Sequence, residues 1–189
     1  MPADPLFDLT RTNPPHTHFE VSYKVAQLGK GSYGTVYRAE DKTTDAKLAV
    51  KISISDEGEC DGRELYLLGR VQGHAHVVRL LDGACSPYFL VLVMEVGCMN
   101  LYEYMGGSGG GPVPPGSGTV PPIPPILAGG IVPSAFATAL GVQVAMALEH
   151  VHSLDIIHRD LYTKNIVIRH DGTAMVVDFG QSIHVGVQD

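Results

Sequence analysis

A run dominated by glycine and proline, residues 106–133, divides this chain of 189 residues into two parts of different character. Only scattered valine, isoleucine and leucine residues interrupt the run. Such a segment cannot bury enough apolar surface to offset the entropy lost when it becomes ordered. We therefore predict a flexible insertion within one folded domain. Recognition of its prolines by a partner protein is the less favoured alternative.

The part of the chain before this run is rich in short segments with a preference for β structure. Residues 1–20 hold four prolines and no periodic pattern, and we expect them to form a mobile tail. One helix-like segment, residues 61–71, places Glu64, Leu68 and Val71 on a common face. Alternating β-branched and aromatic residues predict about five strands, at residues 23–28, 35–40, 47–52, 77–81 and 88–93.

The part after the run begins with a predicted helix that extends to about Ser153, with Ser134 as its N-cap. A β hairpin follows, with strands at residues 166–169 and 174–177 and an Asp171-Gly172 turn. The predicted fold class is α+β, with a small antiparallel sheet and one helix, followed by the beginning of a helical lobe. The helix is indicated by apolar residues at helical spacing: Phe136, Leu140, Val144, Leu148 and Val151.

The composition argues against several classes of protein. The net charge of −7 and the absence of a basic run argue against a surface for nucleic acid. No stretch resembles a signal peptide or reaches membrane-spanning length, so we expect a soluble, cytoplasmic protein with no membrane partner. Three widely spaced cysteines, Cys60, Cys85 and Cys98, are typical of reduced thiols in an intracellular protein.

A glycine-rich segment, Gly29-Lys30-Gly31-Ser32-Tyr33-Gly34-Thr35-Val36, has the pattern G-x-G-x-x-G-x-V. In a dinucleotide site such a loop opens a helix. Here the residues that follow favour a strand, so we predict a hairpin tip whose backbone could lie over phosphates without obstruction by Cβ atoms. A glycine-rich hairpin without a ligand explains this segment equally well.

Lys51 lies in a predicted strand, on the same face as Ala49 and Ser53. An inward lysine beside a small residue suits a cation that meets nucleotide phosphates, although a lysine that merely reaches solvent is the simpler reading of this strand alone. Glu64 is the candidate carboxylate partner. Alternatively, Glu64 could form a capping box with Asp61 at the start of the helix.

The segment His158-Arg159-Asp160-Leu161-Tyr162-Thr163-Lys164-Asn165 is followed closely by Val177-Asp178-Phe179-Gly180. Asp160 could orient or deprotonate a hydroxyl group. Asn165 and Asp178 could bind a hard cation through oxygen. A metal site at the histidine pairs His74-x-His76 and His150-x-His152 is disfavoured, because no further ligand lies at suitable spacing.

Together and in this order, these motifs resemble the protein kinase family, from about residue 23 to residue 189. The resemblance implies a small lobe and hinge at residues 21–97, the insertion at 106–133, and the start of the large lobe at 134–189. It implies ATP and Mg²⁺ as cofactors and a protein substrate with a Ser/Thr or Tyr hydroxyl. Met94 would be the gatekeeper, and Leu68, Leu80, His158 and Phe179 would form the apolar spine between the lobes.

The resemblance also implies individual roles. Asp160 would be the catalytic base, Lys51 and its partner Glu64 would bind phosphates, and Asn165 and Asp178 would be the metal ligands. The nucleotide would contact Leu28, Gly29, Gly31, Gly34, Val36, Ala49, Lys51, Glu95, Gly97 and Val167.

Two departures from the family pattern affect the expected function. Tyr162 stands where many Ser/Thr kinases have a lysine, and Lys164, placed as in many tyrosine kinases, could restore the charge. No Ala-Pro-Glu segment follows Gly180, so we expect an incomplete kinase domain. The alternative to an active kinase is therefore a truncated or non-catalytic module that binds ATP or a partner without turnover.

Overall fold

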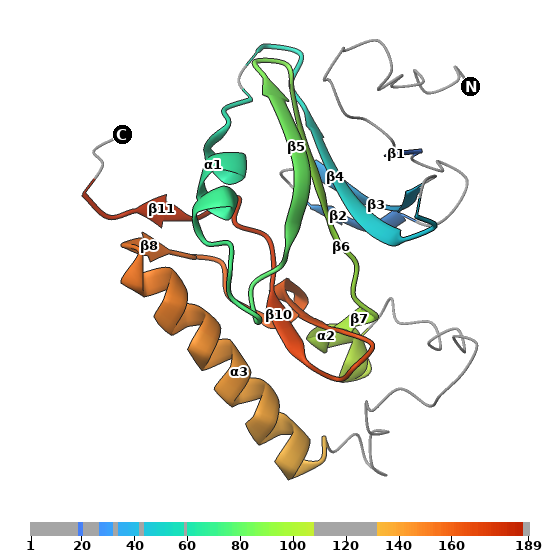
Figure 1. Ribbon diagram of the computed structural model, residues 1–189, viewed down its shortest axis with the longest axis vertical. Coiled ribbons are helices and arrows are strands. Elements are labelled where there is room, and N and C mark those ends of the chain that lie inside the picture. Colours follow the sequence, from blue (N-terminus) through green and yellow to red (C-terminus); the bar gives the residue numbers. More distant parts are fainter. Residues whose placement is uncertain are drawn as a thin grey trace.

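The computed structural model describes residues 19–20, 27–31, 34–41, 44–58, 60–107 and 132–186. A twisted sheet with the short helix α1 (Arg63–Arg70) beside it forms the upper part of the molecule, and the long helix α3 (Ser134–Ser153) lies below (Figure 1). We refer to the upper part as the small lobe and to the lower part as the second lobe. The predicted insertion falls outside the described residues, apart from residues 106–107 and 132–133.

The small lobe is built on an antiparallel sheet with strand order β1-β3-β4-β6-β5, and β2 also pairs with β3. The predicted α+β class with a small antiparallel sheet is confirmed. The strands are β1 (Phe19–Glu20), β2 (Gln27–Gly31), β3 (Gly34–Asp41), β4 (Lys47–Ile54), β5 (Leu80–Ser86) and β6 (Phe89–Glu95).

Two details of the sheet differ from the sequence prediction. The short strand β1 lies in the segment expected to be a tail, and the rest of that segment is outside the described residues. The fourth predicted strand, residues 77–81, was placed too early, because β5 begins at Leu80. Val77 instead forms a parallel bridge with Val176, and the Val78 N–H donates to the Val176 carbonyl at 3.0 Å. These residues join the small lobe to the second lobe.

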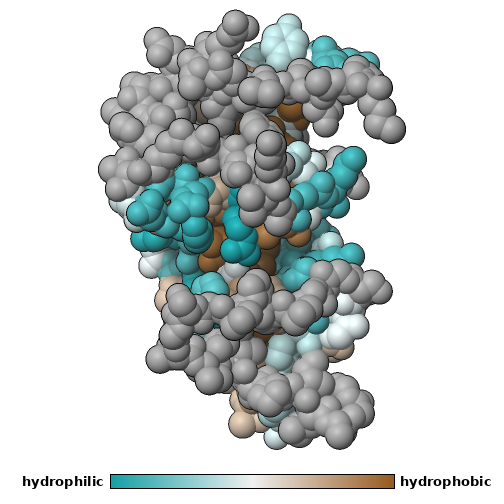
Figure 2. Space-filling model, turned by 90° about the vertical axis from the view of Figure 1, so that its right-hand side faces the viewer, coloured by the Kyte–Doolittle hydropathy of each residue, from teal (hydrophilic) through white to brown (hydrophobic). Residues whose placement is uncertain are grey.

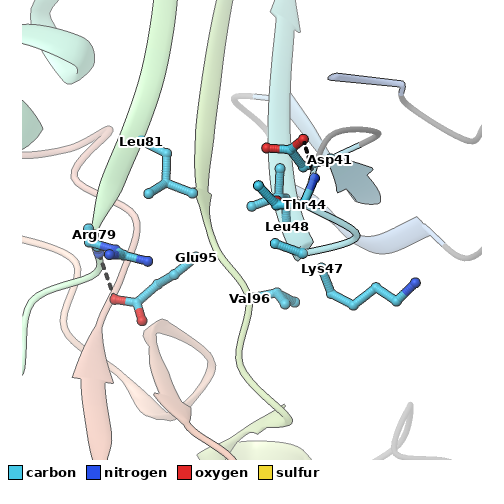
Figure 3. Close-up of a pocket in the computed structure, with 9 residues that line it drawn as sticks. Asp41, Thr44, Lys47, Leu48, Arg79, Leu81, Glu95 and Val96 are labelled. Atoms are coloured by element: carbon cyan, nitrogen blue, oxygen red, sulfur yellow. Dashed lines mark hydrogen bonds between the residues drawn. The ribbon is translucent and has the colours of Figure 1, made fainter. Parts of the chain in front are cut away.

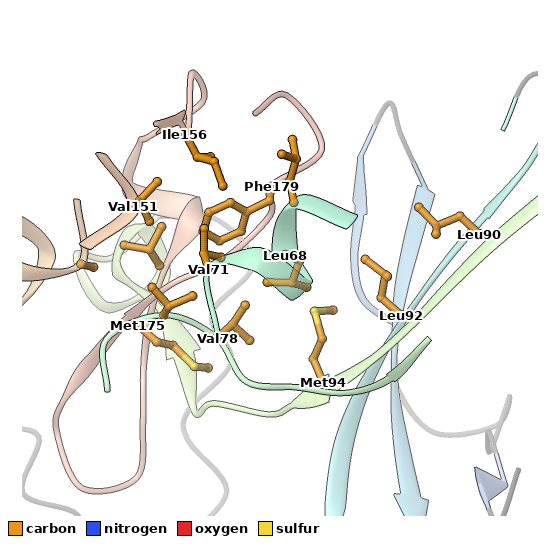
Figure 4. Packing of buried hydrophobic residues seen from close by; sticks show 14 residues of the cluster. Leu68, Val71, Val78, Leu90, Leu92, Met94, Val151, Ile156, Met175 and Phe179 are labelled. Atoms are coloured by element: carbon orange, nitrogen blue, oxygen red, sulfur yellow. The ribbon is translucent and has the colours of Figure 1, made fainter. Parts of the chain in front are cut away.

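Side chains alternate between the two faces of β4, and both faces are buried. Leu48, Val50 and Ile52 pack with Val91 and Val93 of β6 on one face. On the other side, Leu92 and Met94 join a core that runs from β6 through α1 to α3 (Figure 4). Because this core draws residues from both lobes, burial of apolar surface fixes the lobes to each other.

The helix α1 turns Glu64, Leu67 and Leu68 inward. Gly62 is its N-cap residue, and the Asp61 carboxylate accepts a hydrogen bond from the Arg63 N–H at 3.0 Å. The capping box weighed from the sequence does not form. Glu64 points to the interior of the small lobe.

The second lobe begins with a helix that the sequence prediction missed, α2 (Leu101–Tyr104), which follows the short strand β7 (Met99–Asn100). Asn100 and Glu103 form a capping box at its start. The predicted helix at 134–153 is confirmed as α3, but Pro133 rather than Ser134 occupies the N-cap position, with no side-chain cap hydrogen bond. The Pro133 carbonyl accepts a hydrogen bond from the Ala137 N–H at 3.0 Å, which is the first bond of the helix.

The face of α3 that is buried carries Leu140, Ala147 and Val151. Phe136 and Val144 are half-buried at the edge of the same contact. By length and composition α3 is also apolar enough to cross a membrane, the one such helix in the described part of the chain. It packs against β10 (Ala174–Val176), but only 17% of its apolar stretch is buried.

The predicted hairpin is confirmed as β9 (Ile166–Ile168) and β10, which pair antiparallel, and β7 pairs with the other edge of β9. Gly172 in the turn has φ +81°, a conformation that glycine adopts without steric cost. Two further short strands, β8 (Ile156–Ile157) and β11 (Ile183–His184), pair beside the end of α3. The 3₁₀ helix η1 (Thr163–Asn165) leads into β9.

The histidine pairs have structural contacts at the junction of the lobes. His74 stacks on His150 with 5.0 Å between ring centroids, and His76 Nδ1 lies 2.9 Å from the Ala174 carbonyl. Burial, together with neighbouring His150 and His76, lowers the pKa of His74. Among the described residues, no group of three or more His, Cys, Asp or Glu side chains could hold a metal ion.

Candidate active site

The centre of the site is Lys51, on the inward face of β4, with only 4% of its surface exposed. Its Nζ lies 2.8 Å from both carboxylate oxygens of Glu64 on α1. It also lies 2.8 Å from Asp178 Oδ1, in the segment after β10. One ammonium group therefore joins the sheet, the helix and the second lobe, and the ion pair predicted for Lys51 and Glu64 is present.

The charges in this cluster depend on one another. Burial by itself lowers the pKa of Lys51, but Glu64 and Asp178 raise it by more, so it lies above its ordinary value. Burial raises the pKa of Glu64, Lys51 offsets this only in part, and Asp178 raises it further. The two carboxylates favour the charged form of Lys51, whereas burial and the charge of Asp178 disfavour the ionised form of Glu64.

The loop that carries Asp160 is held by hydrogen bonds on both sides. The Asn165 Nδ2 group donates to the Asp160 carbonyl and to Asp160 Oδ2, each at 2.9 Å. The Asp160 N–H donates to His158 Nδ1 at 3.3 Å, and His158 Nε2 lies 3.0 Å from the Val177 carbonyl. Burial lowers the pKa of His158, which favours the neutral ring. Asp160 is therefore oriented by two neighbours of its own loop.

Two residues of this region adopt left-handed backbone conformations that are costly for residues other than glycine, Arg159 with φ +65° and Asp178 with φ +63°. Such strain persists only where the surrounding structure enforces it, and it is frequent at active sites. Here the enforcing contacts include the Lys51–Asp178 ion pair and the hydrogen bond from the Val177 N–H to the Asn165 carbonyl at 3.0 Å. The same hydrogen bond brings Asn165 next to Asp178.

Asn165 and Asp178 present the chemistry of a site for a hard cation. The side-chain nitrogen Nδ2 of Asn165 is already bound to Asp160. The side-chain oxygen Oδ1 is therefore the atom that can act as a ligand. The side chain of Asp178 is 39% exposed, so its carboxylate remains accessible. Mg²⁺ typically takes one or two carboxylate or carbonyl ligands from a protein and the rest from water and phosphate. The two residues fit that pattern.

Tyr162 and Lys164 belong to the same loop, but their surroundings differ. Burial raises the pKa of Tyr162, and the charges of Asp160 and Asp178 add to the effect, so its phenol is neutral. The Lys164 ammonium lies over the ring of Tyr102 in α2, 5.0 Å from the ring centroid. This cation–π contact directs Lys164 toward α2.

The residues expected to enclose an adenine base come from both lobes. Ala49 and Val36 lie on the inward faces of β4 and β3, and Val167 lies on β9. The hinge, residues 95–97, runs along β9, and Met94 before it belongs to the interlobe core. Two residues of the apolar spine expected from the sequence, His158 and Phe179, contact each other edge to face, with 4.9 Å between ring centroids.

Gly97 allows the hinge to approach this hairpin closely. A Cβ atom at Gly97 would collide with Val167 Cγ1 and would lie 3.0 Å from the Ile168 carbonyl oxygen and from Met175 Cε. A side chain at this position therefore requires the Val167 side chain to move and the hinge and the Ile168 carbonyl to separate slightly.

Replacement of Gly97 with alanine should destabilise the protein by about 1–3 kcal/mol, the usual cost of overpacking. Urea denaturation of both proteins measures the change. Gly69→Ala in α1 is the matched control, since a Cβ atom there meets nothing within 4 Å. That change should stabilise the protein by up to about 1 kcal/mol through helix propensity. A Gly97→Ala protein as stable as the unaltered one would show that the hinge is not packed against β9.

The glycine-rich segment forms the β2–β3 hairpin, in which Gly31 pairs with Gly34. The predicted hairpin is therefore confirmed, and the glycines do not open a helix as they would in a dinucleotide site. Gly34 has φ +141°, and a Cβ atom there would lie 2.5 Å from Ser53 Oγ. Leu28 and Gly29 lie on β2 just before the tip, whereas Ser32 and Tyr33 are outside the described residues.

A separate cavity of about 320 Å³ lies outside this site, between the β3–β4 turn, the start of β5 and the outer side of the hinge (Figure 3). Leu48, which lines it, projects from the face of β4 opposite to Ala49 and Lys51. On the side of the molecule that is at the right in Figure 1, hydrophilic side chains flank a few hydrophobic ones at mid-height (Figure 2). The chemistry of Lys51, Asp160 and Asp178 is therefore not located in this cavity.

Sequence reasoning missed several contacts of the site, among them those of Arg169 with Glu95 and of Tyr102 with Lys164. Arg169 donates from Nε and Nη2 to the two oxygens of Glu95, at 2.9 and 2.8 Å. These partners are 74 positions apart. The only signal in the sequence is their opposite charge, which does not identify a pair.

Comparisons with known proteins agree with this geometry. The family described as the protein kinase domain matches residues 23–188. The chain is 30% identical over 187 residues to a CBL-interacting protein kinase 22 of Oryza sativa subsp. japonica. That alignment covers 86% of this chain and 38% of the relative, so the chain spans well under half the length of that protein. The chain belongs to the protein kinase family.

Proposed function

We propose that this chain provides the ATP-binding and catalytic residues of a protein kinase that transfers the γ-phosphoryl group of ATP, with Mg²⁺, to a Ser/Thr or Tyr hydroxyl of a protein. The observation that carries the proposal is the position of Lys51, held between Glu64 and Asp178 at 2.8 Å from each. Phosphoryl transfer depends on positioning and charge stabilisation more than on covalent chemistry by the protein. A fixed cation flanked by oxygen ligands meets that need.

Each residue then has one task. Lys51 would bind the α- and β-phosphates, and Glu64 would hold Lys51 in place. Asn165 and Asp178 would hold Mg²⁺, which supplies positive charge along the phosphates. Asp160 would orient the acceptor hydroxyl and accept its proton. Its hydrogen bonds with Asn165 support this role, because they fix the carboxylate before the substrate arrives.

The placement of the apolar residues expected to enclose a base supports ATP as the donor. Val36 and Ala49 from the small lobe would cover one side of the adenine ring and Val167 the other. The backbone of residues 95–97 would hydrogen-bond its edge. The glycine-rich hairpin at Gly29, Gly31 and Gly34 would lie over the phosphates. Lys164 would contribute charge near the acceptor once it leaves the ring of Tyr102.

Two measurements on the same preparation test this proposal. A fluorescent ATP analogue should bind with an affinity that falls when EDTA removes Mg²⁺, because Asn165 and Asp178 act through the metal. Radiolabelled ATP should transfer phosphate to a generic protein substrate. Binding without transfer would favour the non-catalytic alternative, and absence of binding in the presence of Mg²⁺ would overturn the proposal.

A further inference from the structure

The Glu95 carboxylate, at the end of β6, is bound by three hydrogen-bond donors. Arg169 Nη2 and the Arg79 N–H donate to Oε1, at 2.8 and 2.7 Å, and Arg169 Nε donates to Oε2 at 2.9 Å. The side chains of Arg169 and Glu95 are only 19% and 20% exposed. Burial by itself raises the pKa of Glu95, but the hydrogen bonds from Arg169 and Arg79 outweigh it, and the pKa is lowered. Arg169 and Glu95 therefore form a bidentate, charge-assisted pair.

The other end of Arg169 is fixed to the β9–β10 hairpin. Its N–H donates to the Thr173 carbonyl at 2.8 Å, and Nη1 reaches the Ala174 carbonyl at 3.4 Å. Arg169 directly follows β9, the strand that carries Val167. One side chain therefore connects the hinge to the strand that forms the opposite wall of the base pocket.

Arg169 makes this connection on the side of the hinge that faces away from Ala49 and Lys51. Met94 points into the interlobe core, so Glu95, the next residue on the strand, points to the other face. At the far end of the hinge, the Cys98 N–H donates to the Ile168 carbonyl at 2.8 Å, and Cys98 Sγ lies 2.8 Å from His170 Nδ1. The hairpin thus holds the hinge at Glu95 and at Cys98, on either side of Val96 and Gly97.

We propose that Arg169 is a positioning residue for nucleotide binding, which sets the spacing between the hinge backbone and Val167. The inference rests on the proposed function, since it requires that adenine occupies the space between them. Arg169 itself touches neither base nor phosphate. It acts through Glu95, and the flat guanidinium fork gives the contact a fixed geometry that a lysine cannot reproduce.

The test is the affinity of adenosine, ADP and Mg-ATP for the unaltered chain and for Arg169→Gln, measured by calorimetry well below the melting temperature. We expect binding to weaken about 10-fold, as the loss of one charge-assisted contact implies. The factor should be similar for all three ligands, because the effect passes through the base pocket and not through the phosphates. Arg169→Lys should recover only part of the loss.

A double-mutant cycle with Glu95→Gln separates positioning from general destabilisation. The combined variant should bind no more weakly than Arg169→Gln alone, since the two residues act as one unit. If Arg169→Gln does not fold, the affinities of Glu95→Gln and Arg169→Lys for the same three ligands still test the proposal. The matched control is Arg63→Gln, which removes an exposed ion pair with Asp61 at 3.4 Å and should leave affinity unchanged.

The outcomes distinguish the two proposals. If the unaltered chain binds none of the three ligands, the proposed function fails. If it binds them and Arg169→Gln binds equally well, only the role of Arg169 fails, even if the variant melts at a lower temperature. Loss of affinity for ADP and ATP but not for adenosine would also overturn it, because that pattern locates the effect at the phosphates.

Discussion

Replacement of Asp160 with asparagine should lower the rate of phosphoryl transfer by roughly 10²–10⁴, the usual contribution of a positioned base. Asparagine has nearly the same shape and can still accept the hydrogen bond that Asn165 donates to Oδ2 at 2.9 Å. It cannot accept a proton from the acceptor hydroxyl. Nucleotide affinity should therefore stay close to that of the unaltered protein while kcat falls. Steady-state kinetics with a generic protein substrate, together with nucleotide titration, measure both quantities.

The control for this variant is Asp56→Asn, which makes the same chemical change at an exposed turn of the small lobe. It should leave both kcat and affinity unaltered. A kcat for Asp160→Asn within a factor of two of the original would contradict the role of Asp160 as a base. A parallel loss of nucleotide affinity would instead indicate that the variant disturbs the loop.

Replacement of Lys51 with methionine should affect stability and nucleotide binding together. Glu64, 7% exposed, would keep its burial and lose the cation that lies 2.8 Å away. Removal of one partner from a buried ion pair typically costs about 3–5 kcal/mol. For a protein of this size each kcal/mol lowers the melting temperature by about 2–4 °C. Nucleotide affinity should fall as well, because the cation for the phosphates is gone.

The loss of stability in Lys51→Met should depend on pH in a defined direction. The folded-state pKa of Glu64 is already raised by burial, and without Lys51 it should rise further. A carboxyl group whose pKa is raised on folding costs least below its unfolded-state pKa, and most once pH exceeds its folded-state value. The destabilisation should therefore be larger at pH 8 than at pH 5. Thermal unfolding at both pH values tests this.

Lys47→Met is the matched control, since Lys47 lies on the same strand but is 52% exposed and pairs with Glu40 at the surface. Its effect should be within about 1 kcal/mol, as for other surface pairs. If Lys51→Met and Lys47→Met melt at the same temperature, the buried cluster does not stabilise the fold.

Local patterns in the sequence predicted the elements that hold the site. The helical spacing from Phe136 to Val151 predicted α3 with its observed bounds, and Asp171-Gly172 predicted the β9–β10 turn. Alternation along the strand predicted that Lys51 shares a face with Ala49 and Ser53, but it did not establish that this face is buried. Periodicity and turn chemistry act over a few residues, so a single sequence contains them in full.

Contacts between segments that are distant in the sequence were harder to predict. The strand β5 was placed too early because Val77 and Val78 are apolar and β-branched, yet they pair with Val176 of the second lobe. The helix α2 has only four residues, too short for periodicity, although its capping box at Asn100 and Glu103 is visible in the sequence. Ser134 was a plausible cap by residue type, but Pro133 already provides the extended backbone that precedes α3.

Lys51 has one near and one remote partner along the chain, Glu64 at 13 positions and Asp178 at 127. A contact that closes a short loop costs little chain entropy, while a remote one must wait for the intervening chain to fold back. We therefore expect the pair with Glu64 to form early, among the local contacts of the small lobe, and the contact with Asp178 to form last. During synthesis the cation would then have a single partner before the complete charge cluster is assembled.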